Sequence, residues 1–247
     1  VLPLRPMSWA GATVGGRRRC ARCGDFPMTD SPDNEGRDLP NLRTMADHEV
    51  GVGPHPKPWP DDPRLDPELL ARGDRRNVVD KYRYWTNDAI LADLDSRRHA
   101  FHIAIENWQH DFNIGTVVRN ANAFLAAEVH IVGKRRWNRR GAMVTDRYQH
   151  VRHHPTVEGF TDWADLQSLP LVGIDILPGS LPLEEATLPE ACVLVFGQEG
   201  PGLSVEMQQS CDVVYSIAQF GSTRSINAGV ASGIAMHTWV RQHVRSG

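Results

Sequence analysis

The segment CVLVFGQEGPGLS (192–204) starts as a short apolar run and ends in a polar, glycine-rich turn. Apolar runs of similar length occur at FHIAIE (101–106), EVHIVG (128–133), LVGID (171–175) and DVVYSI (212–217). Runs that are apolar at nearly every position are typical of strands buried on both faces of a parallel sheet. Because helical patterns separate these runs, we predict an α/β fold with a parallel sheet.

Capping signals place the expected helices. Ser, Thr, Asp and Asn side chains cap helix N-termini, and Pro is tolerated in the first turn. On these grounds we predict six helices. The first three are a short helix that begins at Asp66-Pro67-Glu68, a helix capped by Asn87 that runs to about Arg98, and a helix over Ile114–Ala126. The other three are a short helix capped by Thr161 or Asp162 that ends near Leu166, a helix capped by Ser204 that ends near Ser210, and a helix from Ile226 to about His243.

The first part of the chain has a different composition. It carries an arginine run at 17–19 and a proline-rich stretch from Pro54 to Pro63, with no helical or strand period. Such a composition buries too little apolar surface to offset chain entropy. No apolar segment follows the arginines, so a secretory signal is not expected. We predict three parts: a disordered tail over 1–63, a short helical extension over 64–98 and the main domain over 99–247.

Composition narrows the class of protein. The 247 residues carry a formal net charge of −3, so affinity for nucleic acid has to come from a local patch. No apolar run approaches the roughly 18 residues that span a bilayer, and no membrane association is expected. The four cysteines are too few for a disulfide scaffold, which favours a reducing, cytoplasmic setting.

Two sequence features are compatible with a metal, but neither is sufficient. Cys20 and Cys23 form a C-x-x-C pair, which is half of a zinc site or a redox pair if it is functional. Two ordinary thiols are the favoured interpretation, because two further ligands are missing nearby. His153 and His154 have no carboxylate or thiol at ligand spacing. We therefore predict no metal.

Three polar segments follow predicted strands: DFNIGTVVRN (111–120), FGQEGPGLS (196–204) and AQFGSTRSINAG (218–229). In open α/β sheets ligands bind outside the carboxyl ends of the strands, so these segments are expected to meet at one pocket. Taken singly, each also fits a turn or a helix cap. A carboxylate between glycines, as at Glu199, is poorly explained by turn chemistry. Neither a phosphate-binding Walker loop nor G-x-G-x-x-G after the first strand is present.

Together the three segments resemble the SpoU (TrmH) family of RNA ribose 2′-O-methyltransferases, within the SPOUT superfamily. The matching motifs are NIGTVVRNANAF, LVFGQEGPGLS and SINAGVASGIAMHTWVRQ, within about residues 99 to 243. The resemblance implies a sheet fold with a deep trefoil knot near the C-terminus and S-adenosylmethionine bound at the knot. It also implies a homodimer with its active sites at the interface. Ile226 and Gly229 depart from the usual leucine and serine.

The resemblance also assigns roles by motif. The implied catalytic set is Asn113, Arg119, Glu199, Ser225 and Asn227, and the implied cofactor pocket is Gly197, Glu199, Gly202, Ile217 and Ile226. An arginine is always protonated and is a poor general base, whereas its fork suits a phosphate. We therefore expect Arg119 to hold the phosphate beside the target ribose. That phosphate or Glu199 would then accept the proton, with Ser225 and Asn227 orienting these groups.

A basic segment follows the run at 128–133. Basic side chains neutralise phosphates, and interleaved aromatic rings such as Trp137 and Tyr148 stack on unpaired bases. The alternative is a solvated charged loop. With Arg119, the residues expected to contact RNA are Lys134, Arg135, Arg136, Arg139, Arg140 and Arg147.

The leading hypothesis is an S-adenosylmethionine-dependent methyltransferase of tRNA or rRNA. We favour tRNA, because the main domain lacks a large accessory RNA module. One alternative is a catalytically silent RNA-binding homologue. The presence of all five implied catalytic residues argues against this alternative. Another is a nucleotide-cofactor oxidoreductase, which the missing G-x-G-x-x-G argues against.

Overall fold

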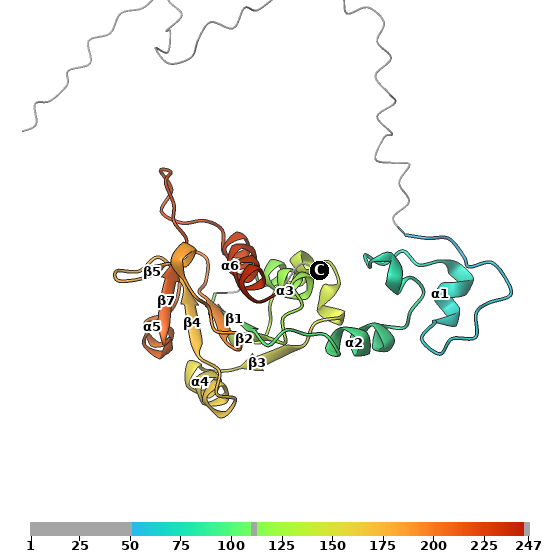
Figure 1. Ribbon diagram of the computed structural model, residues 1–247, viewed down its shortest axis with the longest axis horizontal. Coiled ribbons are helices and arrows are strands. Elements are labelled where there is room, and N and C mark those ends of the chain that lie inside the picture. The colour runs from blue at the N-terminus through green and yellow to red at the C-terminus, as the bar shows by residue number, and fades with distance from the viewer. Residues whose placement is uncertain (1–50, 110–112, 245–247) are drawn as a thin grey trace, which may run out of the picture. The chain divides into compact units, whose positions relative to one another are not determined.

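The computed structural model describes residues 51–109 and 113–244 and contains a seven-stranded sheet (Figure 1). The strand order is β3-β2-β1-β6-β4-β7-β5, and every neighbouring pair is parallel. The predicted parallel α/β sheet is thus confirmed. The strands are β1 (His102–Asn107), β2 (Val129–Gly133), β3 (Val151–His154), β4 (Leu171–Ile174), β5 (Leu181–Pro182), β6 (Val193–Phe196) and β7 (Val213–Ser216).

Helices connect the strands and precede the sheet. The α-helices are α1 (Pro67–Arg72), α2 (Asn87–Asp95), α3 (Ile114–Ala123), α4 (Val157–Leu166), α5 (Val205–Ser210) and α6 (Ala228–His243). Short 3₁₀ helices are η2 (Asp80–Tyr82), η3 (Arg140–Ala142), η4 (Thr145–Arg147) and η5 (Leu183–Glu185). Within 51–109 and 113–244, none of these helices combines the length and apolar character needed to cross a membrane.

Two hydrophobic layers cover the sheet. On β1, Ile103 and Ile105 pack into one layer with side chains of α3 and α6. Ala104, which points the other way along the strand, packs into a second layer with side chains of α4 and α5. Figure 1 shows the same division, with α3 and α6 on one side of the sheet and α4 and α5 on the other. Burial on both faces explains why β1, β2, β4 and β6 are apolar at almost every position.

Several predicted boundaries differ from the structure. Helix α4 starts four residues before Thr161, because the hydroxyl of Thr156 accepts the Gly159 amide and caps it. Helix α2 is capped by Thr86 rather than Asn87. Strand β3 was not predicted, because its sequence VRHH lacks an apolar pattern at the sheet edge. The predicted caps Asp66 and Ser204 are confirmed.

Residues 51–98 form a small structured unit ahead of β1. Val52 pairs with Asp74 and Leu65 pairs with Trp85 in isolated antiparallel bridges. Val52 and His55, which belong to the predicted tail, are thus hydrogen-bonded to Asp74 and Leu70. Residues 1–50 of that tail, including Cys20 and Cys23, lie outside the described residues. The boundaries at 63 and 98 stay predictions.

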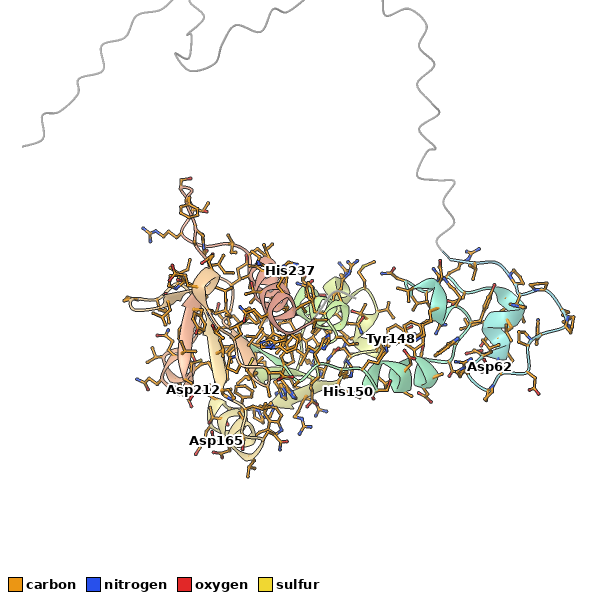
Figure 2. The ribbon with its side chains drawn as sticks, viewed as in Figure 1. Asp62, Tyr148, His150, Asp165, Asp212 and His237 are labelled. Carbon is orange, nitrogen blue, oxygen red and sulfur yellow. The ribbon has the colours of Figure 1, made fainter. Side chains whose placement is uncertain are left out.

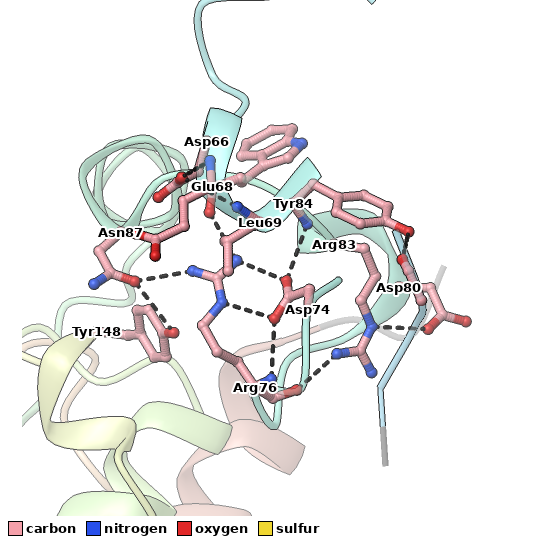
Figure 3. A network of polar contacts seen from close by, with 12 residues as sticks. Asp66, Glu68, Leu69, Asp74, Arg76, Asp80, Arg83, Tyr84, Asn87 and Tyr148 are labelled. Atoms are coloured by element: carbon pink, nitrogen blue, oxygen red, sulfur yellow. Dashed lines mark hydrogen bonds and ion pairs between the residues drawn. The ribbon is translucent and has the colours of Figure 1, made fainter. Parts of the chain in front are cut away.

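Asp74 is the centre of this unit (Figure 3). Its buried carboxylate accepts hydrogen bonds from the Arg76 guanidinium at 2.7 and 2.9 Å and from the Tyr84 amide at 3.0 Å. Burial by itself would raise the pKa of Asp74, but the bonds from Arg76 and Tyr84 outweigh it and hold that pKa below its usual range. Arg76 also donates to Asn87, whose Oδ1 accepts from the Tyr148 hydroxyl.

The same unit holds the end of the basic segment. The Arg98 guanidinium donates to the carbonyl oxygen of Tyr148 at 2.9 Å and to Gln149 Oε1 at 3.0 Å. His150 contacts the Asp95 carboxylate at 2.9 Å, and Tyr148 and His150 both lie beside α2 (Figure 2). Tyr148 is buried in the cluster that α2 forms with Trp85. The predicted stacking role of Tyr148 is therefore wrong, because its ring is part of a core.

Candidate active site

A cavity of about 600 Å³ lies at the carboxyl ends of β4, β6 and β7. Open α/β sheets bind their ligands at this edge. The lining residues end or follow these three strands: Ile174 to Leu177 at the end of β4, Phe196 to Gly202 at the end of β6, and Ile217, Gln219 and 224–228 after β7, with Ala231 of α6. Two of the three predicted polar segments thus form its walls.

The turn after β6 depends on two glycines. Gln198 and Gly202 exchange backbone hydrogen bonds of 3.1 and 3.0 Å, which folds the segment back on itself. A Cβ atom at Gly197 would overlap the backbone of Gly202. At Gly202, φ is +73°, a value that L side chains rarely adopt, and a Cβ there would collide with the Asp175 carboxylate. Only glycine at both positions allows this tight turn.

A polar cluster joins all three predicted segments. The Asn113 amide donates to the Glu199 carboxylate, and the Asn227 amide donates to Asn113 Oδ1 at 2.8 Å. Asn227 Oδ1 accepts from the backbone amides of Gly229 and Val230 and thereby caps α6. Asn113 stands at the N-terminus of α3 without a side-chain capping bond. Its side chain is used for the cluster instead of a cap.

The structure brings together most of the predicted site residues. Ser225 and Asn227 line the cavity, and Asn113 is buried next to it. All residues predicted for the cofactor pocket are in the lining: Gly197, Glu199, Gly202, Ile217 and Ile226.

Arg119 is the exception. It is exposed on α3 and does not line the cavity of this chain. It lies six positions after Asn113, which corresponds to a rise of about 9 Å along the helix. The side chains of Asn113 and Arg119 therefore lie at different positions along α3.

Sequence reasoning missed the residues that hold this site in place. The buried Glu106 accepts the Trp108 indole N–H at 2.8 Å and the Ser204 amide at 2.7 Å. Gln198 Oε1 accepts the Trp108 amide at 3.0 Å. A carboxylate inside the apolar run FHIAIE was the available signal. Asp175, which also faces the cavity, follows a predicted strand but carries no motif.

The basic residues lie on the loop between β2 and β3. Asn107 at the end of β1 donates to the carbonyl oxygens of Lys134 and Arg136 at 2.6 and 2.9 Å and so anchors the start of the loop. A Cβ at Gly115 would come within 2.9 Å of the Asn138 carbonyl, so the loop packs closely on α3. All predicted RNA-contacting residues of this loop are exposed: Lys134, Arg135, Arg136, Arg139, Arg140 and Arg147.

The profile of the SpoU rRNA methylase family matches residues 100–237, which is more than half of the chain. The chain belongs to the SpoU methylase family. The predicted resemblance is thus confirmed, and the matched range contains β1 to β7, the cavity and the polar cluster. A relative from Mycobacterium ulcerans, described as an uncharacterized tRNA/rRNA methyltransferase, is 32% identical over 171 residues. That alignment covers 66% of this chain and 54% of the relative, so the chain spans about half the length of the relative.

Solved structures share the SpoU fold with this chain. The SpoU methyltransferase AviRb from Streptomyces viridochromogenes, crystallised with AdoMet, gives a TM-score of 0.55 at 23% identity, covering 63% of this chain and 62% of AviRb. An RNA 2′-O ribose methyltransferase gives a TM-score of 0.54 at 21% identity, covering 60% and 58%. At these identities the likeness concerns the fold.

One departure from the SpoU motifs has a structural reason. Gly229 occupies the position at which serine is common in the third motif. It is buried in the first turn of α6, and a Cβ there would lie 2.7 Å from Thr116 Cγ2 of α3. A larger residue at this position would therefore require the Thr116 side chain or α3 to shift.

Proposed function

We propose that this chain is an S-adenosylmethionine-dependent RNA methyltransferase that modifies a ribose 2′-hydroxyl of tRNA or rRNA. The observation that carries the proposal is the linkage of Asn113, Glu199 and Asn227 beside a cavity at the carboxyl ends of the strands. Membership of the SpoU family supports it, as do the AdoMet complex of AviRb and the 2′-O activity named for a structural neighbour.

The cavity has features that fit a nucleoside cofactor. Ile217 and Ile226 offer apolar walls for an adenine ring, and the Gly197–Gly202 turn exposes backbone amides. Gln219 lines the same cavity, and its buried Oε1 has no hydrogen-bond partner among the described residues. A buried unpaired acceptor is costly, so a ligand N–H such as the adenine amino group would satisfy it. When bound, S-adenosylmethionine supplies an electrophilic methyl group.

The polar cluster would prepare the ribose hydroxyl for attack. That hydroxyl is a weak nucleophile until its proton is drawn away, and positioning accounts for much of the rate. Asn113 holds one Glu199 oxygen, which leaves the carboxylate oriented towards the cavity. Glu199 or the neighbouring RNA phosphate would accept the proton. Ser225 and Asn227 would orient the ribose.

We also propose a homodimer in which a second copy supplies Arg119. Within one chain Arg119 is exposed and outside the cavity, so the polar set is incomplete without another source. Helix α6 leaves Val230 and Ile234 exposed, at 53% and 39%, beside Asn120 of α3. An apolar strip next to the predicted functional arginine suits a self-complementary interface. Arg119 would then grip the RNA phosphate beside the partner's cavity.

The exposed basic loop supports RNA as the substrate. Its six cations would neutralise phosphates, and Trp137, which is half-buried against the main core, would stack on an unpaired base. We also propose that the chain has the deep trefoil knot of the family and that it is located in the cytoplasm.

The decisive experiment transfers labelled methyl groups from S-adenosylmethionine to total tRNA and rRNA and maps the modified nucleotide. We expect a 2′-O-methyl group at a defined position, and its loss in Glu199→Gln. Label found only on a base atom would refute the ribose chemistry. Calorimetry separates the alternatives: cofactor binding without methyl transfer would indicate the silent homologue, and binding of NADH instead would indicate the oxidoreductase.

A further inference from the structure

A second cluster of potential ligands lies at the opposite end of the sheet from the cavity. His102 is the first residue of β1, Glu128 immediately precedes β2, and His130 is near the start of β2. The strands are parallel, so these residues gather at their amino ends, whereas the cavity is at the carboxyl ends. The cluster is therefore separate from the proposed methyltransferase site.

The three side chains present their ligand atoms to one another. His102 Nδ1 lies 3.1 Å from His130 Nε2, and Glu128 Oε2 lies 3.9 Å from the same nitrogen. One ligand atom from each residue falls within 4.8 Å of the other two. Around a tetrahedral zinc ion, neighbouring nitrogen and oxygen ligands are roughly 3.3 Å apart. The two imidazoles already meet that spacing, whereas the Glu128 carboxylate would have to move closer.

The surroundings resemble the outer shell of a metal site. His130 is fully buried, and its Nδ1 lies 3.0 Å from Nε2 of His154 on β3. A metal-bound imidazole donates its other ring N–H to an acceptor, which fixes the ring, and His154 Nε2 is within reach to accept it. Arg152 Nε contacts both Glu128 oxygens at 3.1 Å. The Trp163 ring of α4 lies over His130 at 4.0 Å between centroids and shields it from water.

We propose that His102, Glu128 and His130 bind a divalent transition-metal ion of the zinc class. Two imidazoles and one carboxylate are a ligand set that zinc accepts, with a fourth position left for water or another ligand. His102 and Glu128 are partly exposed, which gives the ion a route in. The bound ion ties the start of β1 to the start of β2.

This proposal differs from the sequence-based prediction of no metal, which stays untested. The ligands come from two strands whose order in the sheet is set by pairing, so spacing along the chain did not reveal them. Without an ion, the histidines form a chain of neutral, hydrogen-bonded imidazoles from His102 through His130 to His154. The experiment has to distinguish these two states.

The test titrates the metal-stripped full chain with Zn²⁺ by calorimetry and with Co²⁺ by absorption. We expect one ion per chain and visible cobalt bands without the near-ultraviolet band of a thiolate ligand. Zn²⁺ should also raise the melting temperature, because ligand that binds the native state stabilises it. Neither readout depends on methyl transfer, so failure of this proposal and failure of the proposed function are distinguishable.

Two variants test the ligands without disturbing the fully buried His130. Glu128→Gln and His102→Gln should each lower the association constant by at least about tenfold, the scale known for changes around metal sites. The matched control is His153→Gln, on the opposite face of β3, whose side chain contacts the Gly133 carbonyl instead. The control should bind as the parent chain does. Circular dichroism of each variant verifies the fold.

Three results would overturn the proposal. The first is the absence of stoichiometric binding, which would leave the neutral imidazole chain as the native state. The second is unchanged affinity in Glu128→Gln and His102→Gln. The third is a thiolate band in the cobalt spectrum, which would place the ion at cysteines such as Cys20 and Cys23.

Discussion

Asn227 Nδ2 donates a 2.8 Å hydrogen bond to Asn113 Oδ1 across a sequence separation of 114 residues. This bond connects the N-terminus of α6 to the N-terminus of α3. Asn113 in turn donates to Glu199 in the turn after β6. The orientation of one carboxylate is therefore set by the starts of two helices that pack side by side.

Asn113→Ala should reduce methyl transfer strongly, because Glu199 loses the donor that orients it. We expect kcat to fall about 100-fold, the scale of a small misplacement of a catalytic group. The dissociation constant for S-adenosylmethionine should change little, since Asn113 does not line the cavity. Asn122→Ala on the same helix is the control, because Asn122 contacts the Tyr148 carbonyl, at 3.5 Å, rather than the polar cluster. Equal kcat in both variants would remove Asn113 from the mechanism.

Gly197→Ala should destabilise the fold and abolish cofactor binding, because the added methyl group overlaps the Gly202 backbone. Overpacking of this kind costs roughly 3 kcal/mol. Gly221→Ala serves as the comparison, since no heavy atom of the described residues lies within 4 Å of the added Cβ. Thermal melting and calorimetric titration measure both effects. A Gly197→Ala chain with parental melting and binding would contradict the packing described for this turn.

Arg119→Ala should cut turnover far more than cofactor affinity, because Arg119 is outside the cavity of its own chain. Arg119→Lys should restore little, since a lysine lacks the bidentate fork. In a shared-site homodimer, mixing Arg119→Ala chains with Asn113→Ala chains should recover activity, because one of the two sites then carries no substitution. Mixed chains that form heterodimers yet stay inactive would argue against a shared site.

Arg135→Gln and Arg140→Gln should weaken RNA binding in a salt-dependent way. Each cation that no longer neutralises an RNA phosphate should reduce the slope of log K against log salt by about 0.7 to 0.9. Arg72→Gln on α1 is the control, because Arg72 pairs with Glu68 away from the basic loop. Filter binding across a salt series gives the slopes. Parallel slopes for all four proteins would show that the loop is only a solvated surface.

Asp74→Asn should lower the melting temperature by roughly 5 °C or more, because it breaks a buried pair with Arg76. The pKa of Asp74 lies below its usual range in the folded chain, so its contribution to stability is present above about pH 4 and is lost as the pH falls further. The variant lacks this carboxylate, and its melting temperature should therefore decline less between about pH 5 and 3.

The control for this experiment is Asp80→Asn. The Asp80 carboxylate is 99% exposed and lies 3.7 Å from Arg83, so its removal should leave the acid profile of the parent chain. Circular dichroism melts at several pH values provide the comparison. An identical acid profile for Asp74→Asn and the parent would show that Asp74 does not carry this pH dependence.

Local patterns were informative where the cause is local. The apolar runs at β1, β2, β4 and β6 were recognisable because both faces of these strands are buried, and β7 was recognisable although it is only half-buried. The Ser204 cap was predictable because a cap depends on adjacent residues. Strand β3 was not, because an edge strand does not need an apolar pattern. Tyr148 was misassigned because its burial depends on packing against α2 and Trp85.

The amino-acid sequence alone determined the α/β class and the three polar segments, and it supplied the motifs of the family, because these follow from residues close together in the chain.

The tertiary structure decided which side chains meet. Pairing of β1 with β6 brings Glu106 next to the turn that contains Glu199 and the Ser204 amide that follows it. Packing of α3 on α6 brings Asn113 within hydrogen-bond distance of Asn227. The same packing leaves Arg119 outside the cavity. Strand pairing also assembles His102, Glu128 and His130. These arrangements depend on strand order and helix packing, which arise from burial and hydrogen bonding over long sequence separations.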